Sequence, residues 1–108
     1  MPNSFKSNVA INVETTGNTV YTCPGATQTT LIGMTIANKS NGTVTANAFL
    51  RRSSVDYAII ANAPVLTGST LVPIGGDQKV VLEPADEIKV TVSANNSVDV
   101  ITSLLEIS

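Results

Sequence analysis

Short runs in which hydrophobic and polar residues alternate recur along the chain, and residues that favour turns separate them. The clearest run covers residues 43–54, where Val, Ala, Ala and Leu occupy every second position and Thr, Asn, Phe and Arg lie between them. Alternation with a period of two indicates a strand with one buried face. No stretch combines helical spacing of apolar residues with helix-capping residues. The pattern therefore predicts strands and no helix.

The runs that predict strands cover residues 8–14, 19–23, 29–38, 43–54, 55–64, 69–77, 79–83, 87–94 and 97–108. Eight or nine short strands with regular turn signals are typical of a β-sandwich. The sequence therefore predicts an all-β, single-domain β-sandwich of jelly-roll or immunoglobulin-like type over residues 9–108. Residues 1–8, which are polar around a lone Phe5, are expected to form an N-terminal arm that reaches a neighbouring subunit, or a frayed terminus.

Several local signals refine this expectation. Gly33, in the middle of a predicted strand, indicates a bulge or a close backbone approach. Asn41-Gly42 is the strongest two-residue hairpin signal in the chain, and Gly75-Gly76-Asp77 predicts a further turn. Two faces are expected to be apolar, those of Val9, Ile11 and Val13 and of Ile32, Met34 and Ile36.

The stretch "VVLEPADEIKV", residues 80–90, places Glu83, Asp86 and Glu87 around Pro84. Carboxylates this close together suit an acid/base pair, a metal site or a turn between strands. We expect the turn, because Pro84 fixes its own φ and Asp86 is able to cap backbone amides. No complementary base or nucleophile accompanies the carboxylates, which are expected to be solvated. The inward residues of the flanking strands should be Val80, Leu82, Ile88, Val90 and Val92.

Composition narrows the function further. The formal charge is −2 and 13% of the residues are charged, so the chain lacks the basic surface of a nucleic-acid or lipid binder. Histidine is absent, which removes the commonest general base and metal ligand. Cys23, the single cysteine, is expected to be a buried or half-buried apolar residue. We therefore expect no enzyme activity, no catalytic residue, no metal, no cofactor, no nucleic acid and no membrane association.

Charged residues gather in "RRSSVDY", residues 51–57. Arg51, Arg52, Asp56 and Tyr57 are candidates for contacts between subunits, because an arginine fork pairs well with a carboxylate. The alternative is a solvated strand end with an Arg–Asp pair inside the chain. Phe5, in the expected arm, is the fifth candidate contact.

Most of the chain, residues 19–107, resembles small virion structural proteins of tailed bacteriophages, including phages of marine and freshwater cyanobacteria. The features that carry the resemblance are "VYTCP", "TTLIGMTIAN" followed by a polar turn, "IIANAPVLTGSTLV", "VVLEPADEIKV" and the closing "SVDVITSLLEI". Those proteins more often have Gly-Asp at the corner where this chain has Ala85-Asp86.

The resemblance implies a non-enzymatic virion component made in the host bacterial cytoplasm. Its leading form is a capsid decoration or cement protein, which binds the major capsid protein on the outer surface of the head and stabilises capsomer junctions. Such a protein is expected to be a homo-oligomer, for example a trimer. The alternative is a neck, tail or fibre protein that serves attachment. A glycan-binding module is a third reading, which the absence of Trp and of clustered aromatic residues disfavours.

Overall fold

A computed structural model describes residues 3–74 and 79–107 of the chain. In these residues the chain forms β-strands and no helix. The strands are β1 (Asn3–Ala10), β2 (Asn18–Thr22), β3 (Gln28–Asn38), β4 (Val44–Arg52), β5 (Val55–Val65), β6 (Thr70–Ile74), β7 (Val80–Leu82), β8 (Glu87–Val92) and β9 (Val98–Ile107). The predicted turn at 75–77 lies outside the described residues.

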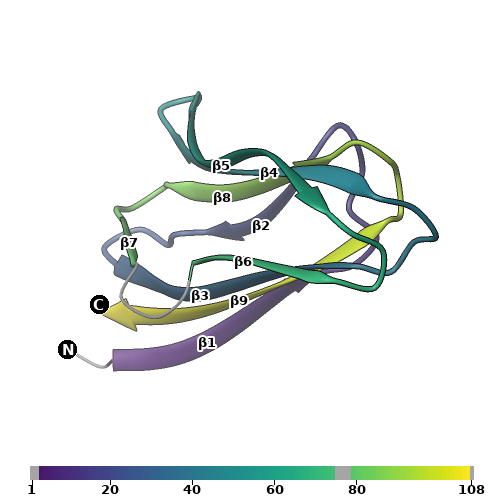
Figure 1. Ribbon diagram of the computed structural model, residues 1–108. Coiled ribbons are helices and arrows are strands. Elements are labelled where there is room, and N and C mark those ends of the chain that lie inside the picture. Colours follow the sequence, from purple (N-terminus) through teal and green to yellow (C-terminus); the bar gives the residue numbers. More distant parts are fainter. Residues whose placement is uncertain (1–2, 75–78, 108) are drawn as a thin grey trace.

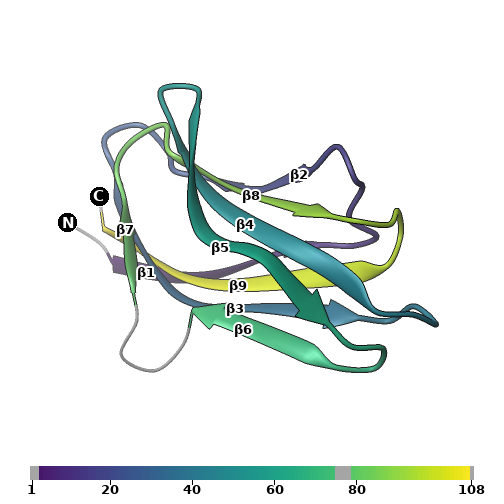
Figure 2. The same ribbon diagram turned by 45° about the horizontal axis from the view of Figure 1, so that its top comes forward.

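The strands form two antiparallel sheets that face each other (Figures 1 and 2). Sheet A has the order β1-β9-β3-β6, and β7 also pairs with β3; sheet B has the order β2-β8-β4-β5. The chain crosses between the sheets at most of its connections, and β9 lies between β1 and β3. This is the strand order of a jelly roll, so the predicted β-sandwich is confirmed and its jelly-roll form is the one adopted.

Aliphatic side chains fill the space between the sheets. The fully buried large side chains include Leu31, Met34, Ile36, Leu82, Ile88, Leu104, Val13, Val90, Val98 and Val100. The predicted alternation of β4 is confirmed, because its Val and two Ala residues at every second position are buried. Leu82, Ile88, Val90 and Val92 are also buried as predicted, and Val80 is partly buried against the core.

A bulge changes the expected face of β3. The register between β3 and β9 shifts between Leu31 and Gly33, so the predicted bulge at Gly33 is confirmed. Because of this shift, Leu31 and Met34 are both buried, whereas Ile32 between them is only half-buried. The prediction that Ile32 shares the inner face with Met34 was wrong, since a bulge breaks the period of two.

The first strand differs most from its prediction. Residues 3–8, for which the sequence suggested an arm, belong to β1, which pairs with β9 from Asn3 opposite Ile107 to Ala10 opposite Val100. Val9 and Ile11 are each 68% exposed, and only Val13 reaches the core. Asn12, which follows the end of β1, has a φ of 55° and interrupts the extended backbone, so Val13 does not share the face of Val9 and Ile11.

Asn41-Gly42 does not make the hairpin that its sequence suggested. β3 belongs to sheet A and β4 to sheet B, so this loop carries the chain between sheets. The buried side chain of Asn38 shapes the loop, since its Nδ2 donates to the carbonyls of Gly42 and Val65, both at 2.8 Å. The tight hairpin lies instead between β4 and β5, where Ser53 and Ser54 have φ values of 52° and 63°.

The Glu83–Asp86 corner also joins the two sheets, because β7 pairs in sheet A and β8 in sheet B. The N–H of Asp86 donates to the carbonyl of Glu83 at 3.0 Å, and Ala85 has a φ of 74°. These features define a type II turn with Pro84 at its second position and Ala85 at the third, where glycine is normally required. The predicted tight corner is confirmed.

Ala85→Gly should raise the unfolding free energy by about 1 kcal/mol. A left-handed alanine is strained by roughly 1–2 kcal/mol, and this exceeds the greater entropy that glycine gains in the unfolded chain. Urea denaturation of both proteins measures the difference. Ala94→Gly is the matched control, because Ala94 is exposed in a loop without a positive φ and glycine there should be neutral or destabilising. Equal changes at both positions would contradict the strain at Ala85.

Candidate functional site

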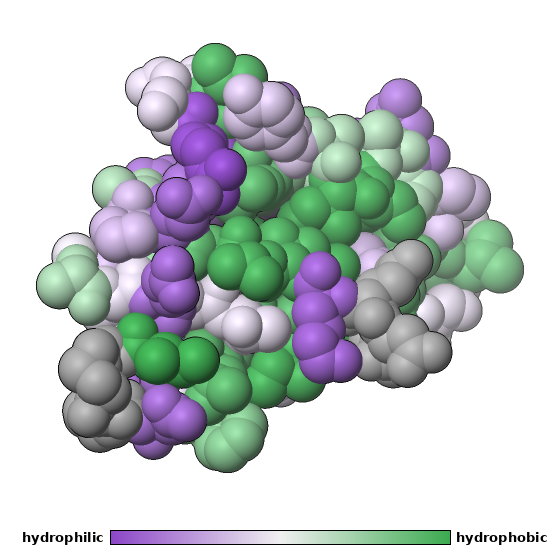
Figure 3. Space-filling model, turned by 90° about the vertical axis from the view of Figure 1, so that its left-hand side faces the viewer, coloured by the Kyte–Doolittle hydropathy of each residue, from purple (hydrophilic) through white to green (hydrophobic). Residues whose placement is uncertain are grey.

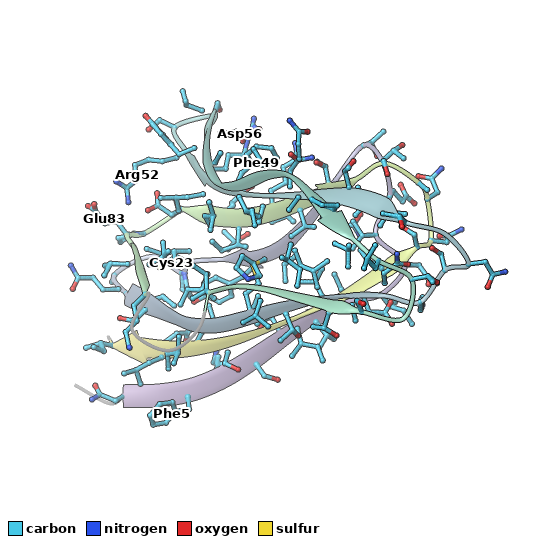
Figure 4. The ribbon with its side chains drawn as sticks, viewed as in Figure 1. Phe5, Cys23, Phe49, Arg52, Asp56 and Glu83 are labelled. Carbon is cyan, nitrogen blue, oxygen red and sulfur yellow. The ribbon has the colours of Figure 1, made fainter. Side chains whose placement is uncertain are left out.

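Charged side chains gather at the end of the sandwich where the β4–β5 hairpin meets the turn between β7 and β8. Figure 4 shows Arg52 and Glu83 reaching toward one another there, with Asp56 farther out on the hairpin. These side chains surround an open pocket of about 460 Å³. The pocket is lined by Arg51, Arg52, Ser53, Ser54, Glu83, Pro84, Ala85, Asp86 and Glu87, and we call these residues the charged corner.

Arg52 holds the carboxylate of Asp86 at the centre of the charged corner. Its Nε lies 3.0 Å from each carboxylate oxygen, and its Nη2 donates to Oδ2 at 2.5 Å. The same Oδ2 accepts the backbone N–H of Glu83 at 2.8 Å, which confirms the predicted cap. The Asp86 side chain is 4% exposed and that of Arg52 is 40% exposed. Asp86 is therefore buried beneath the guanidinium, and the prediction that it is solvated was wrong.

These contacts determine what the carboxylate can do. Hydrogen bonds from Arg52 lower the pKa of Asp86, and they outweigh the opposing effect of burial. Asp86 in turn raises the pKa of the Arg52 guanidinium. A general base that works near neutral pH needs a pKa close to 7, whereas Asp86 is shifted away from it. The carboxylate is suited to fixing the hairpin against the corner.

The lowered pKa values of Asp86 and Glu106 make the protein sensitive to acid. A carboxyl group whose pKa is lower in the folded state stabilises that state above its ordinary pKa, and this stability is lost as the pH falls through the folded value. The ordinary values are 3.8 for Asp and 4.5 for Glu. The unfolding free energy should therefore be level from neutral pH to about 5 and fall below about 4. Denaturant titrations from pH 7 to pH 2 measure it.

Asp86→Asn serves as the control for this acid dependence. The variant should be less stable than the parent protein at pH 7. The difference should shrink as the pH falls below the ordinary pKa of an aspartate, because the parent protein then loses the stability that depends on its ionised carboxylate. A difference that stays constant across this range would contradict the assignment of Asp86 as a titrating stabiliser.

Four of the five sequence-predicted contact residues come together at this end of the molecule. Arg51 Nη1 lies 2.8 Å from Asp56 Oδ1 on the opposite strand of the hairpin, and Tyr57 is 54% exposed. Arg51 and Arg52 thus have carboxylate partners inside their own chain. Phe5 does not join this group, since it lies on β1 and points away from the sandwich in Figure 4. Contacts of these five residues with another subunit stay a prediction.

A buried polar network links the two sheets near the charged corner, and sequence reasoning missed it. The hydroxyl of Tyr21, on β2, donates to Glu106 Oε2 at 2.5 Å and lies 2.8 Å from Thr29 Oγ1 on β3. Glu106 also pairs with Lys6 Nζ at 3.1 Å. Burial, and then the bond to Glu106, raises the pKa of Tyr21, while the hydroxyl lowers the pKa of Glu106. The network joins β1, β2, β3 and β9.

Cys23 lies beside this network inside the sandwich (Figure 4). It is 1% exposed, and its Sγ lies 3.3 Å from Thr29 Oγ1. The expectation of a buried cysteine is confirmed. Within residues 3–74 and 79–107, no group of three or more Cys, Asp or Glu side chains is placed to hold a metal ion.

The outward faces of the two sheets differ in charge. The face of sheet B has charged and amide side chains in directly opposed pairs: Arg51 with Glu87, Phe49 with Lys89, and Asn47 with Thr91. The amide of Asn47 donates to Thr91 Oγ1 at 3.1 Å. This face therefore carries charged and amide side chains beside the ring of Phe49.

The outward face of sheet A combines apolar side chains with hydroxyl and amide side chains and carries almost no charge. Its opposed rows are Asn3–Ile107–Gln28, Phe5–Leu105–Thr30–Val81, Ser7–Ser103–Gly33, Val9–Ile101–Thr35 and Ala37–Asp99. Phe5 is 78% exposed and Val9 68% exposed. Among these residues only Asp99 is charged, and its carboxylate lies 2.9 Å from Lys39 Nζ. We call these rows the apolar face.

Hydrophobic side chains also gather at the end of the molecule that carries the hairpin tip. Figure 3 looks at this end and shows a hydrophobic area in the centre, with a strip of hydrophilic side chains along one side. Exposed Val55 and Val81 are among the large apolar side chains from the strands at this end.

No helix long and apolar enough to cross a membrane occurs in the described part of the chain.

Comparisons with known proteins identify the fold. No protein-family model matches the sequence, and a search of curated proteins found no match. A solved protein of Bacillus endospore appendages, reported as a novel family of disulfide-linked pili, has a similar structure, with a TM-score of 0.59 and 13% identity. The similarity covers 98% of this chain and 88% of that one.

A chain of the T13 IBDV viral particle is also similar, in a structure reported as a missing link in the evolution of icosahedral viruses. The TM-score is 0.54 and the identity 10%, over 96% of this chain and 30% of the viral one. At these identities the similarity shows a shared fold. Both neighbours are subunits of assembled structures, a pilus and a viral particle.

Proposed function

We propose that the protein is a non-enzymatic structural component of a virion. In its specific form it is a decoration or cement protein of a tailed bacteriophage, which binds the outer surface of the head and stabilises the junctions between capsomers. The resemblance of residues 19–107 to phage virion proteins supports this proposal. The jelly-roll fold, which occurs in a viral particle and in a pilus, is consistent with it.

The observation that carries the proposal is the apolar face. Large apolar side chains, among them Phe5, Val9 and Ile101, are exposed on this face. Exposed apolar side chains that gather on one surface mark sites of interaction with other proteins. Here the apolar face contains one charged residue, Asp99, whereas the paired rows on the opposite face of the sandwich contain four, Arg51, Asp56, Glu87 and Lys89. A decoration protein needs this asymmetry, because one side lies against the shell and the other faces water.

The neck, tail or fibre is the alternative location, because a module with one docking face suits those parts of a virion equally well. The disulfide linkage described for the pilus protein does not extend to this chain through Cys23, which is buried. The charged corner does not support an enzyme, since its central carboxylate is held ionised by Arg52.

Immunogold electron microscopy of purified virions tests the proposal, with antibody raised against the isolated protein. Even labelling over the head is the expected result. Labelling confined to the neck, tail or fibres would replace the decoration role by the alternative. Unlabelled particles, with antibody that detects the protein in infected cells, would overturn the virion assignment.

A further inference from the structure

The described part of the chain leaves five outer strands, which are β1, β2, β5, β6 and β7. Four of them are short or irregular in ways that hinder pairing with another chain, and β7 has only three residues. β6 contains Pro73 and its register with β3 shifts. β5 contains Pro64 and two register shifts, and the five-residue β2 contains one. Proline and bulges are the usual means by which proteins protect the edges of their sheets.

β1 has neither proline nor a bulge, and Lys6 is its one feature of a kind that protects sheet edges. Its eight residues pair with β9 in one unbroken register, and they include neither proline nor glycine. Six of the eight are exposed and the other two are half-buried, so the second edge of the strand is open along its length. Its one charged residue, Lys6, is already paired with Glu106. A regular, exposed edge of this kind is a template for pairing with another strand.

We propose that β1 pairs with β1 of a second copy of the chain, antiparallel and about a two-fold axis, so that the two A sheets join into one continuous sheet. A two-fold pair uses the same surface on both copies and closes the assembly. Pairing β1 with a different edge would instead produce an open chain of subunits, and the other four outer strands are unsuited to it.

The side chains of β1 select one register for this pair. Directly opposed residues in an antiparallel pair have their side chains on the same face of the sheet. Phe5, Ser7 and Val9 lie on the apolar face, whereas Lys6 and Asn8 point inward to Glu106 and to the carbonyl of Val20. To keep the apolar faces of both copies continuous, odd-numbered residues must therefore lie opposite odd-numbered residues.

The register centred on Ser7 satisfies this condition. It places Phe5 of each copy opposite Val9 of the other, and an aromatic side chain packed beside a β-branched one is a favourable cross-strand pair. It also places Lys6 opposite Asn8. A register centred on Lys6 would instead set two like charges directly opposite each other, which is destabilising. The pair doubles the apolar face, and it follows from the strand alone, whatever the location of the protein in the cell or the virion.

Cysteine cross-linking tests this register. In the proposed pair Ser7 lies opposite Ser7 of the second copy, at a Cα separation of about 4.5–5.5 Å, which a disulfide can span. The Ser7→Cys variant should therefore form a disulfide-linked dimer under mild oxidation. Ser103→Cys is the matched control, because Ser103 is exposed on the same face but lies one strand in from the edge. The wild-type protein, in which Cys23 is buried, reports the background.

The expected result is a cross-linking rate for Ser7→Cys at least about tenfold above that of Ser103→Cys at micromolar protein, since pairing raises the local thiol concentration. Sedimentation of the wild-type protein should give twice the monomer mass. Three results would each overturn the proposal. These are equal rates for the two variants, faster cross-linking through Ser103→Cys, and a wild-type protein that is still monomeric at a concentration on the order of 100 micromolar.

Discussion

Replacing Asp86 with alanine is expected to lower the unfolding free energy by about 3 kcal/mol. The change removes the carboxylate that accepts hydrogen bonds from Arg52 and from the backbone of Glu83. It also leaves a space beneath the guanidinium and a backbone N–H without its acceptor. Removing a buried carboxylate costs more than losing an exposed pair, because the Glu83 N–H that it accepts is left without this partner and its own site in the structure is left unfilled.

Urea denaturation at pH 7 measures this loss, with Asp56→Ala as the matched control. Asp56 belongs to the more exposed pair with Arg51 on the same hairpin, so its removal should cost less than about 1 kcal/mol. If the two variants lost the same stability, Asp86 would have no special role in the charged corner.

The second large effect is expected for Tyr21→Phe, which should cost about 2 kcal/mol. The hydroxyl is the donor to the buried carboxylate of Glu106, and a hydrogen bond to a charged group contributes about 1.5–3 kcal/mol. Without it, Glu106 keeps only its contact with Lys6 among the partners that the structure shows. The aromatic ring still fills its place in the core, so little packing is lost.

Tyr57→Phe is the control for this variant, because Tyr57 is 54% exposed and its stability change should be within about 0.5 kcal/mol. The acid limb of the Tyr21→Phe variant provides a second readout. Since the hydroxyl lowers the pKa of Glu106, its removal should raise that pKa and flatten the loss of stability below about pH 4.5. An unchanged acid limb would contradict the coupling.

Local pattern was sufficient to predict most of the fold. Alternation identified β4 and β8, the breaker Pro24-Gly25 marked the end of β2, and Pro84 with Asp86 identified the tight corner. These features depend on interactions within a few residues. The assignment of each strand to one of the two sheets depends instead on contacts between distant parts of the chain. For this reason Asn41-Gly42 was interpreted as a hairpin, although it joins two sheets.

The hairpin between β4 and β5 likewise could not be predicted from its local sequence. Ser53 and Ser54 adopt left-handed conformations without the Asn or Gly that such a turn usually contains. Pairing of β4 with β5 imposes this conformation, so tertiary structure overrides the local preference. Residues 3–7 of β1 were missed as part of a strand because they are exposed and include only one hydrophobic residue, Phe5.

The candidate site was harder to predict than the fold. The burial of Asp86 depends on Arg52, which lies 34 positions earlier in the chain. The bond between Tyr21 and Glu106 spans 85 positions. Neither hydrophobic periodicity nor a short sequence motif indicates contacts between residues so far apart in the chain. The row of Phe5 and Val9 beside Leu105 and Ile101 likewise becomes a surface only when β9 lies next to β1.

The position of β9 between β1 and β3 also bears on how the chain folds. β9 follows every other described strand, yet both of its neighbours in sheet A come from the first 38 residues. Contacts between such distant segments make folding slow, because a long loop must close before they form. Until β9 has been synthesised, β1 lacks its partner and β3 is open on one side. Sheet A is therefore completed only after translation has passed residue 107, and the nascent chain exposes unpaired strands that a chaperone would be expected to cover.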